Sequence, residues 1–287
     1  MNAVVLNGKH VAAELQQQLK HDVEKLKLQN ITPGLAVLLI GDDPASHTYV
    51  RAKEKAAAEV GIYSVVFRMP ETVTQQQVID RIQQLNQDDS IHGILVQLPL
   101  PKHIDVRTVI DAIDPEKDVD GFHPVNIGNM QLGKDAFLPC TPFGVLHLLK
   151  QYNIDLQGKN TVIVGHSHIV GRPLATLLLN ENATVSVCHA YTKNLKEMTR
   201  MADILIVAVG KKHLITADMV KPGAVVIDVG INREKNRIYG DCDFDEIQSV
   251  ASYITPVPGG VGPMTISMLL YNTVAAARRQ ADRLVTV

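Results

Sequence analysis

The stretch Val162–Pro173, V-I-V-G-H-S-H-I-V-G-R-P, runs from an apolar segment through two glycines to an Arg-Pro pair. An apolar run that ends in glycine is typical of a buried parallel strand, and a second glycine lets a helix begin close to the sheet. Backbone N–H groups at such a helix start can bind a pyrophosphate. The loop is not the usual G-x-G-x-x-G, and many turns with two glycines bind nothing. Its place between an apolar strand and a helix favours a dinucleotide-binding loop.

The chain on both sides of this loop alternates between helix and strand patterns. Apolar residues at spacings of three and four predict helices, which we place at 11–26, 46–60, after Thr74, 141–152 and 264–283. Continuous apolar runs predict strands at 35–41, 63–69, 93–99, 161–164, 184–188, 204–209 and 224–229. Two helix boundaries carry clear signals, because Gly61 is a typical C-terminal cap and Thr74 with Gln77 resembles a capping box.

Strands that alternate with helices predict an α/β fold with parallel sheets covered by helices. The pattern breaks between Asp114 and Pro142, where Pro, Gly, Asp and Asn are frequent, and we place a hinge between two domains there. We expect a first domain over residues 1–140 and a second over 141–263. The second is expected to be Rossmann-like, with a doubly wound parallel sheet, and the two domains to lie around a cleft.

Composition excludes several classes of function. The 287 residues suffice for two domains, and a net charge of −2 gives no general attraction to nucleic acid or to an anionic membrane. The apolar runs are too short to span a bilayer, and no secretion signal is evident. Three dispersed cysteines without a C-x-x-C pair fit a reducing cytosol. The histidines show no H-x-x-x-H pair with a third ligand nearby, so we expect a cytoplasmic protein without a metal site.

Tyr49 and Lys53 are four residues apart in P-A-S-H-T-Y-V-R-A-K, so one helix face presents both. A lysine can act as acid or base near neutral pH if its surroundings lower its pKa. Most helical lysines are simply solvated, and the spacing does not separate these alternatives. Gln97 ends an apolar strand, where it either binds a ligand or caps neighbouring backbone groups.

Two other segments combine turn chemistry with groups that could bind a ligand. Asp118 and Asp120 lie in K-D-V-D-G-F at the predicted hinge, where two carboxylates could hold a polar ligand, although Asp before Gly is also ordinary in turns. The segment Pro256–Thr265, P-V-P-G-G-V-G-P-M-T, is either a rigid corner or a place where backbone approaches a ligand closely.

Together these stretches resemble the bifunctional methylenetetrahydrofolate dehydrogenase/cyclohydrolase family. The motifs that carry the resemblance occur in the family's order over essentially the whole chain: P-A-S-H-T-Y-V-R-A-K, G-I-L-V-Q-L-P-L, K-D-V-D-G-F, P-C-T-P-F-G, V-G-H-S-H-I-V-G-R-P and P-G-G-V-G-P-M-T-I. The resemblance implies oxidation of methylenetetrahydrofolate by a nicotinamide cofactor, followed by hydrolysis of the methenyl cation to formyltetrahydrofolate. It also implies a homodimer and a last helix, 264–287, that packs back on the first domain.

The resemblance assigns roles to individual residues. Lys53 is the expected acid/base of hydrolysis, Gln97 its tuning partner, Tyr49 a group that orders the substrate ring, and Asp120 the acceptor for the pterin. Further folate contacts are expected from Ser46, Pro258, Gly259 and Gly260. The expected cofactor contacts are Thr141, Gly165, His166, Ser167, Ile169, Val170, Gly171, His189 and Ile231.

The choice of cofactor depends on the end of the second strand after the glycine loop. There an Asp or Glu about 20 residues on would bind the ribose hydroxyls of NAD and repel the phosphate of NADP. Ser186–Lys193 contains no acid, so we predict NADP. Relatives that bind NADP often have arginine at the position of His166 or Ala190, and this chain has neither, so we predict a modest preference.

Two other readings remain open from the residues. Another two-domain dehydrogenase, for a hydroxy acid or a shikimate-like substrate, would need a different catalytic dyad, and none is better placed than Tyr49, Lys53 and Gln97. A nucleotide-binding regulatory protein without catalysis would tolerate loss of Lys53 and Gln97, and both are present.

Overall fold

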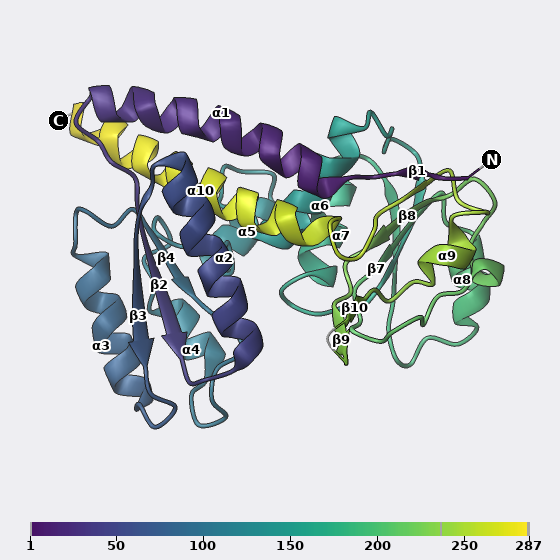
Figure 1. Cartoon of the computed structure of the whole chain (residues 1–287), viewed down its shortest axis with the longest axis horizontal. Coiled ribbons are helices and arrows are strands. Elements are labelled where there is room, and N and C mark those ends of the chain that lie inside the picture. The colour runs from purple at the N-terminus through teal and green to yellow at the C-terminus, as the bar shows by residue number, and fades with distance from the viewer. Residues whose placement is uncertain (1, 236, 286–287) are drawn as a thin grey trace. The chain divides into compact units, whose positions relative to one another are not determined.

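The computed structural model describes residues 2–235 and 237–285, which form two compact units (Figure 1). Unit 1 comprises Met1–Ala13 and Thr141–Thr265, and unit 2 comprises Glu14–Cys140 and Ile266–Val287. The border between residues 140 and 141 is where the sequence-based division was placed. The first thirteen residues differ from that division, because strand β1 (Val4–Val5) pairs in parallel with β11 (Tyr253–Ile254) in unit 1.

Unit 2 contains a three-stranded parallel sheet in the order β3-β2-β4. Its strands are β2 (Gly34–Ile40), β3 (Tyr63–Met69) and β4 (Gly93–Val96). Its helices are most of α1 (Gly8–Leu28), α2 (Pro44–Val60), α3 (Gln75–Asn86), α4 (Val106–Asp111), α5 (Pro124–Gln131) and most of α10 (Val261–Val285). Figure 1 shows α3 and α2 on opposite sides of the strands. Every residue of β2 is buried, as expected for a central strand covered on both faces.

The helix boundaries in unit 2 follow from local hydrogen bonds. Helix α2 begins at Pro44, two residues before the predicted start, because the Asp43 carboxylate accepts hydrogen bonds from both N and Oγ of Ser46. It ends at Val60, and the positive φ of 84° at the next residue, Gly61, confirms the predicted cap. The capping box of Thr74 and Gln77 at the start of α3 is confirmed as well.

The segment predicted as a hinge, between Asp114 and Pro142, is more ordered than its composition suggested. It contains α5 and the first residues of α6 (Cys140–Gln151). Pro124 is in the first turn of α5, which His123 caps by accepting a hydrogen bond from Val125 N. Proline in the first turn of a helix is favourable, so the Pro-rich composition marks a helix start as well as a turn.

Unit 1 contains a six-stranded parallel sheet in the order β1-β11-β8-β7-β5-β6. Its central strands are β5 (Asn160–Val164), β6 (Thr184–Cys188), β7 (Ile204–Val207) and β8 (Val225–Asp228). Its helical elements besides α6 are α7 (Gly171–Asn180), α8 (Leu195–Arg200), the 3₁₀ turn η1 (Ala217–Met219) and α9 (Phe244–Ile247). A separate hairpin, β9 (Asn232–Glu234) with β10 (Arg237–Tyr239), follows β8. The predicted Rossmann-like, doubly wound fold is confirmed.

The chain reverses its direction of winding between β5 and β7, which makes this pair the topological switch point of the sheet. The strand register places Cys188, Val164, Val207 and Asp228 in one row across β6, β5, β7 and β8. The next residues along each strand therefore leave the sheet at one common edge. Ligands of such sheets bind outside this carboxyl edge.

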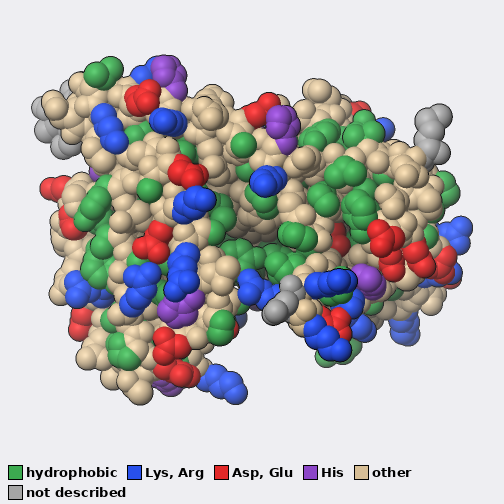
Figure 2. Space-filling view, viewed as in Figure 1, with side chains coloured by type: hydrophobic (Ala, Val, Ile, Leu, Met, Phe, Trp, Pro, Cys, Tyr) green, Lys and Arg blue, Asp and Glu red, His purple; other side chains and the backbone are tan. Residues whose placement is uncertain are grey.

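The described part of the chain shows no helix long and apolar enough to cross a membrane. Acidic and basic side chains are interspersed over the face shown in Figure 2. Among residues 2–235 and 237–285, no three His, Cys, Asp or Glu side chains gather as a metal site.

Candidate active site

Helix α2 buries a lysine. Lys53 is only 8% exposed, on the same helix face as Ser46 and Tyr49, which precede it by seven and four residues. Lysine is almost never buried without a partner. Burial lowers the pKa of Lys53, an effect that the nearby Asp120 and Cys140 oppose. Lys53 is therefore not the solvated helical lysine that its spacing alone would allow.

Gln97 supplies the partner. Lys53 Nζ donates a hydrogen bond of 2.9 Å to Gln97 Oε1, and Gln97 Nε2 donates one of 2.7 Å to the Leu98 carbonyl. The second bond fixes the orientation of the amide, because only its nitrogen can donate to a carbonyl. Gln97 follows β4 directly, at the carboxyl edge of the sheet in unit 2.

Asp120 reaches the same place from the next segment of the sheet. Ile94 N donates to Lys117 O at 2.7 Å, and Asp118 forms a parallel bridge with Ile94, so residues 117–119 run beside β4. Asp120 then follows at the same edge as Gln97. Burial raises the pKa of the Asp120 carboxyl, while Lys53 and a hydrogen bond with Cys140 lower it.

The two aspartates of K-D-V-D-G-F have different surroundings. The Asp118 carboxylate is buried and accepts hydrogen bonds from Phe122 N, His123 N and Asn126 Nδ2. Burial raises the pKa of Asp118 to about 7. Asp118 thus shapes the turn, whereas Asp120 faces the lysine.

Cys140 is a member of this group that sequence reasoning missed. Its buried thiol donates a hydrogen bond of 3.3 Å to Val119 O, and burial next to Asp120 raises its pKa well above the ordinary value. The only signal for it was its place in P-C-T-P-F-G. A cysteine in an apolar context is otherwise a common core residue.

Two contacts hold the segments of Asp120 and Cys140 together. Gly121 has a φ of 75°, and a Cβ there would lie 2.5 Å from the backbone carbon of Leu138 and 2.6 Å from Pro139 N. Asn272 of α10 is buried, and its Nδ2 donates to Val119 O at 2.9 Å and to Leu138 O at 3.1 Å. These contacts fix the spacing between the carboxylate and the thiol.

The remaining predicted folate residues lie in two places. Ser46 and Tyr49 are on α2, and the Ser46 hydroxyl donates to Asp43 at 2.9 Å. The loop Pro258–Gly260 lies in unit 1, where Gly259 O accepts from Lys9 N at 2.9 Å. A Cβ on Gly260 would lie 2.8 Å from the Thr255 side chain, so this loop is tightly packed.

The glycine loop Gly165–Gly171 follows β5 and leaves the sheet of unit 1 at its switch point. A Cβ on Gly165 would overlap the Ala208 carbonyl, and a Cβ on Gly171 would overlap the Gly165 carbonyl. The glycines therefore let the start of α7 lie directly against the strand end. A helix start that lies this close to a strand end, at the carboxyl edge of the sheet, presents backbone N–H groups that can bind a pyrophosphate. The site therefore fits a dinucleotide.

The other predicted cofactor residues lie around this loop or elsewhere in unit 1. Ser167 Oγ accepts from Val170 N at 3.2 Å, and His166 and His189 have ring centroids 5.0 Å apart. Thr141 is at the start of α6, with its Oγ1 3.0 Å from that of Thr265. Ile169 and Ile231 are 40% and 42% exposed. His189 and Ile231 follow β6 and β8, so they leave the sheet at the same edge as Gly165.

A doubly wound sheet with a glycine loop at its switch point, together with a second unit in which a buried lysine lies beside part-buried Gln97 and Asp120, is typical of a two-domain dinucleotide-dependent enzyme. Residues 6–120 match the model of the tetrahydrofolate dehydrogenase/cyclohydrolase catalytic domain, and residues 139–281 match that of its NAD(P)-binding domain. The chain belongs to the tetrahydrofolate dehydrogenase/cyclohydrolase family.

Individual relatives are similar to this chain over nearly its full length. The bifunctional protein FolD of Bacillus anthracis is 58% identical over 280 residues, which are 97% of this chain and 98% of the relative. The crystal structure of the bifunctional enzyme FolD from Campylobacter jejuni is 55% identical, with a TM-score of 0.96, over 97% of this chain and 99% of that one. The structure of the Trypanosoma brucei enzyme, complexed with NADP and an inhibitor, is 39% identical, with a TM-score of 0.94, over 98% and 99% of the two chains.

The chain is accordingly a bifunctional enzyme of one-carbon metabolism, an oxidoreductase and a hydrolase. It oxidises methylenetetrahydrofolate and hydrolyses methenyltetrahydrofolate, as the resemblance implied. This decides against the two other readings that the residues left open, a hydroxy-acid dehydrogenase and a regulatory nucleotide-binding protein.

Proposed function

We propose that the Lys53–Gln97–Asp120 group of unit 2 is the reaction centre for the folate. The observation that carries the proposal is a nearly buried lysine whose pKa is lowered by burial and whose Nζ is fixed by an amide oxygen. A neutral amine in a fixed position can take a proton from water, which an ordinary surface lysine cannot do near neutral pH.

In the hydrolytic step, Lys53 Nζ takes a proton from the water that adds to the methenyl carbon. The carbon–nitrogen bond of the resulting hydroxyl adduct then breaks, and the ring nitrogen that departs receives a proton from the same ammonium. The hydroxyl group loses its proton to solvent as it becomes the formyl carbonyl. One water is consumed and one proton is released overall. Gln97 keeps Nζ in place and tunes its basicity through the hydrogen bond to Oε1.

Substrate orientation is assigned to the groups around the lysine. Asp120 accepts hydrogen bonds from the pterin's amino and ring N–H groups, for which a carboxylate is a matching acceptor. Tyr49, on the same face of α2 as Lys53, orders the substrate ring, and Ser46 one turn earlier assists. The Pro258–Gly260 loop of unit 1 contributes further folate contacts.

For the oxidation we propose NADP as the cofactor, held by the edge of unit 1. When bound, this cofactor would supply the acceptor for the hydride that leaves the methylene carbon. Gly165 to Gly171 would hold the pyrophosphate, Thr141 would contact the nicotinamide end, and Ile231 would add a further cofactor contact. His166, Ser167, His189 and Lys193 remain as partners for the 2′-phosphate. The absence of an acid in Ser186–Lys193 and the Trypanosoma brucei complex with NADP support this choice.

One assay tests the proposal as a whole. Methenyltetrahydrofolate, followed by its absorbance, should form from methylenetetrahydrofolate only with cofactor and should be consumed without any cofactor. Lys53→Met should remove the second reaction. An Lys53→Met enzyme that hydrolyses methenyltetrahydrofolate at the wild-type rate would overturn the assignment of Lys53.

We further propose a cytoplasmic homodimer. The three free cysteines, all buried, suit a reducing compartment. Strand β6 ends the sheet of unit 1. Val187 in this strand is 37% exposed and Leu179 of the preceding helix α7 is 52% exposed, which suits contact with a second copy. Sedimentation at micromolar concentration should give twice the mass of the 31.4 kDa chain, and a monomer there would refute this part.

A further inference from the structure

Asp241 is a buried carboxylate in unit 1 with no part in the chemistry described so far. It follows strand β10 and is completely shielded from solvent. Three consecutive backbone N–H groups donate to its oxygens, those of Val209, Gly210 and Lys211, at 2.7, 3.0 and 2.7 Å. Asn232 Nδ2 adds a fourth hydrogen bond of 2.9 Å. Four donors offset the cost of burying a carboxylate.

The donors belong to two loops at the carboxyl edge of the sheet. Residues 209–211 leave β7, and residues 230–232 leave β8. A Cβ on Gly230 would overlap the Asp241 carboxyl group, so the second loop lies directly on it. Gly230 N also donates to Asp228 Oδ1 at 2.9 Å, and Asp241 N donates to the same oxygen at 2.9 Å. Asp241 therefore ties together the loops after two neighbouring strands.

The first of these loops touches the dinucleotide loop itself. A Cβ on Gly165 would overlap the Ala208 carbonyl and lie 3.4 Å from Val209 Cγ1. Val209 is one of the residues that Asp241 holds, and β7 and β5 form the switch point. Ile231, an expected cofactor contact, lies between two anchored residues, Gly230 and Asn232.

We infer that Asp241 is a positioning residue for the dinucleotide site. Its carboxylate fixes the loops after β7 and β8 relative to the glycine loop, so that the cofactor meets a preformed edge. Asp241 touches no ligand and acts through Val209–Lys211 and Gly230–Asn232. The inference rests on the proposed placement of the cofactor at this edge.

The enzyme has two activities, and only the oxidation uses the cofactor, so hydrolysis serves as an internal control for each variant. Asp241→Asn replaces one acceptor oxygen by an NH₂ group that faces backbone donors. The dissociation constant for NADPH, measured by fluorescence titration, and the KM for NADP should both rise by about tenfold or more. Hydrolysis of methenyltetrahydrofolate without cofactor uses Lys53 of unit 2 and should keep the wild-type kcat and KM.

Asn232→Ala is a milder second variant in case Asp241→Asn does not fold. It removes the fourth hydrogen bond, together with a longer one of 3.4 Å to Tyr239 O, and should raise the dissociation constant for NADPH several-fold.

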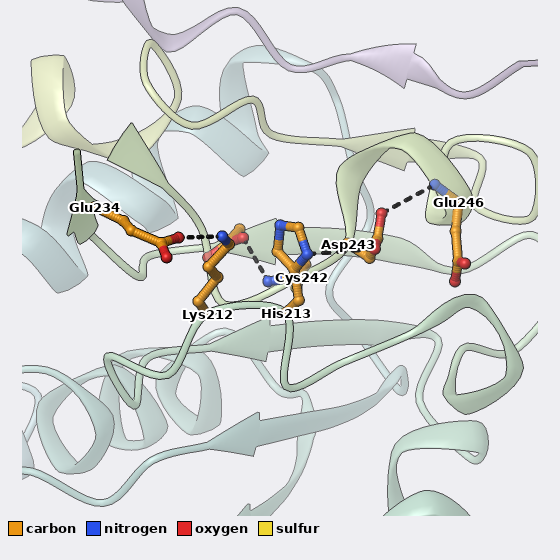
Figure 3. Close-up of polar contacts among 7 residues, drawn as sticks. Lys212, His213, Glu234, Cys242, Asp243 and Glu246 are labelled. Atoms are coloured by element: carbon orange, nitrogen blue, oxygen red, sulfur yellow. Dashed lines mark hydrogen bonds and ion pairs between the residues drawn. The ribbon is translucent and has the colours of Figure 1, made fainter. Parts of the chain in front are cut away.

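Asp243→Asn is the matched control, two residues further along. Figure 3 shows the Asp243 carboxylate between His213, with which it pairs at 3.4 Å, and Glu246, whose N–H it accepts at 3.3 Å. The chemical change is the same as in Asp241→Asn, but it lies outside the two edge loops. Thermal stability should fall, and cofactor affinity should stay at the wild-type value.

Two results would overturn the inference. One is an Asp241→Asn enzyme in which both activities fall in the same proportion, since that is the behaviour of a stabilising residue. The other is a loss of NADPH affinity no larger than that of Asp243→Asn. Failure of the proposed function would show differently, as a wild-type enzyme that does not act on the folates.

Discussion

Gln97 Oε1 accepts a hydrogen bond of 2.9 Å from Lys53 Nζ, while the amide nitrogen of the same side chain is bound to Leu98 O. The lysine comes from the helix after β2 and the glutamine from the end of β4, two strands that pair directly. The pair therefore depends on sheet register, and neither side chain can turn away without leaving a polar group unsatisfied in a poorly solvated place. This coupling makes the basicity of the lysine sensitive to what stands at position 97.

Lys53→Met should abolish hydrolysis of methenyltetrahydrofolate, because an apolar chain of similar length cannot relay a proton. Hydride transfer needs no such relay and should survive in part, so the ratio of the two rates is the measurement. Lys55→Met is the control, since Lys55 pairs at the surface with Glu59 on the same helix. Equal loss in both variants would mean that α2, and not the amine, was damaged.

Gln97→Glu should shift the pH profile of hydrolysis toward higher pH. The neutral amine is the base, so the rate rises as pH increases through the pKa of Lys53, which burial lowers from that of an ordinary lysine, about 10.4. A carboxylate in place of the amide oxygen favours the ammonium and raises that pKa. The rate near neutral pH should therefore fall and recover in alkaline buffer. Gln83→Glu, an exposed change on α3, should leave the profile in place.

Asp120→Asn should shift the same profile in the opposite direction. Asp120 raises the pKa of Lys53, so its neutralisation lowers that pKa and moves the rising limb to lower pH. The KM for folate should increase by roughly 10- to 100-fold, because the charge-assisted bonds to the pterin are lost. The dissociation constant for NADPH should not change. An equal weakening of both ligands would contradict a pterin-binding role.

Asn272→Ala should destabilise unit 2 by about 1–3 kcal/mol, because the part-buried Leu138 carbonyl loses this donor and the buried Val119 carbonyl keeps the weaker donor, the Cys140 thiol. The free energy of unfolding by urea is the measurement. Gln280→Ala on the same helix removes a weaker bond, 3.5 Å to His92 O, and should cost much less. Comparable losses would show that Asn272 is not a principal anchor.

NADP should be preferred over NAD by a modest margin. No carboxylate in Ser186–Lys193 repels the 2′-phosphate, and the rings of His166 and His189, with centroids 5.0 Å apart, are its candidate partners. His189→Asn should reduce the ratio of the two kcat/KM values, whereas His21→Asn on α1 should not. A clear preference of the wild-type enzyme for NAD would refute the prediction.

Much of the fold could be predicted from local pattern. The continuous apolar run of β2, the capping box of α3 and the glycine loop after β5 each carry their signal within a few neighbouring residues. Strands β1 and β11 have two residues each, too few to show a periodicity, and were missed. The pairing between them joins residues about 250 positions apart, which no local pattern reports.

The candidate site, like the fold, could be predicted from the sequence only in part. The spacing of Tyr49 and Lys53 was visible, but burial of the lysine results from packing of α2 and could not be read from the helix. Asp118 and Asp120 looked alike as turn residues, and only the three donors around Asp118 separate them. Asp241 gave no signal, because its backbone donors lie 30 to 32 positions earlier in the chain.

Neither unit is a continuous stretch of the chain, since the path crosses between them after Ala13, Cys140 and Thr265. The first and last crossings fall inside helices α1 and α10. A gene fragment that ends at an internal position therefore leaves at least one unit incomplete, and exchange of the cofactor half between relatives needs three junctions, two of them within a helix. Recombination is thus a poor route to a new cofactor preference in this architecture. Substitutions in the edge loops, such as those at His166 and His189, are a more accessible route.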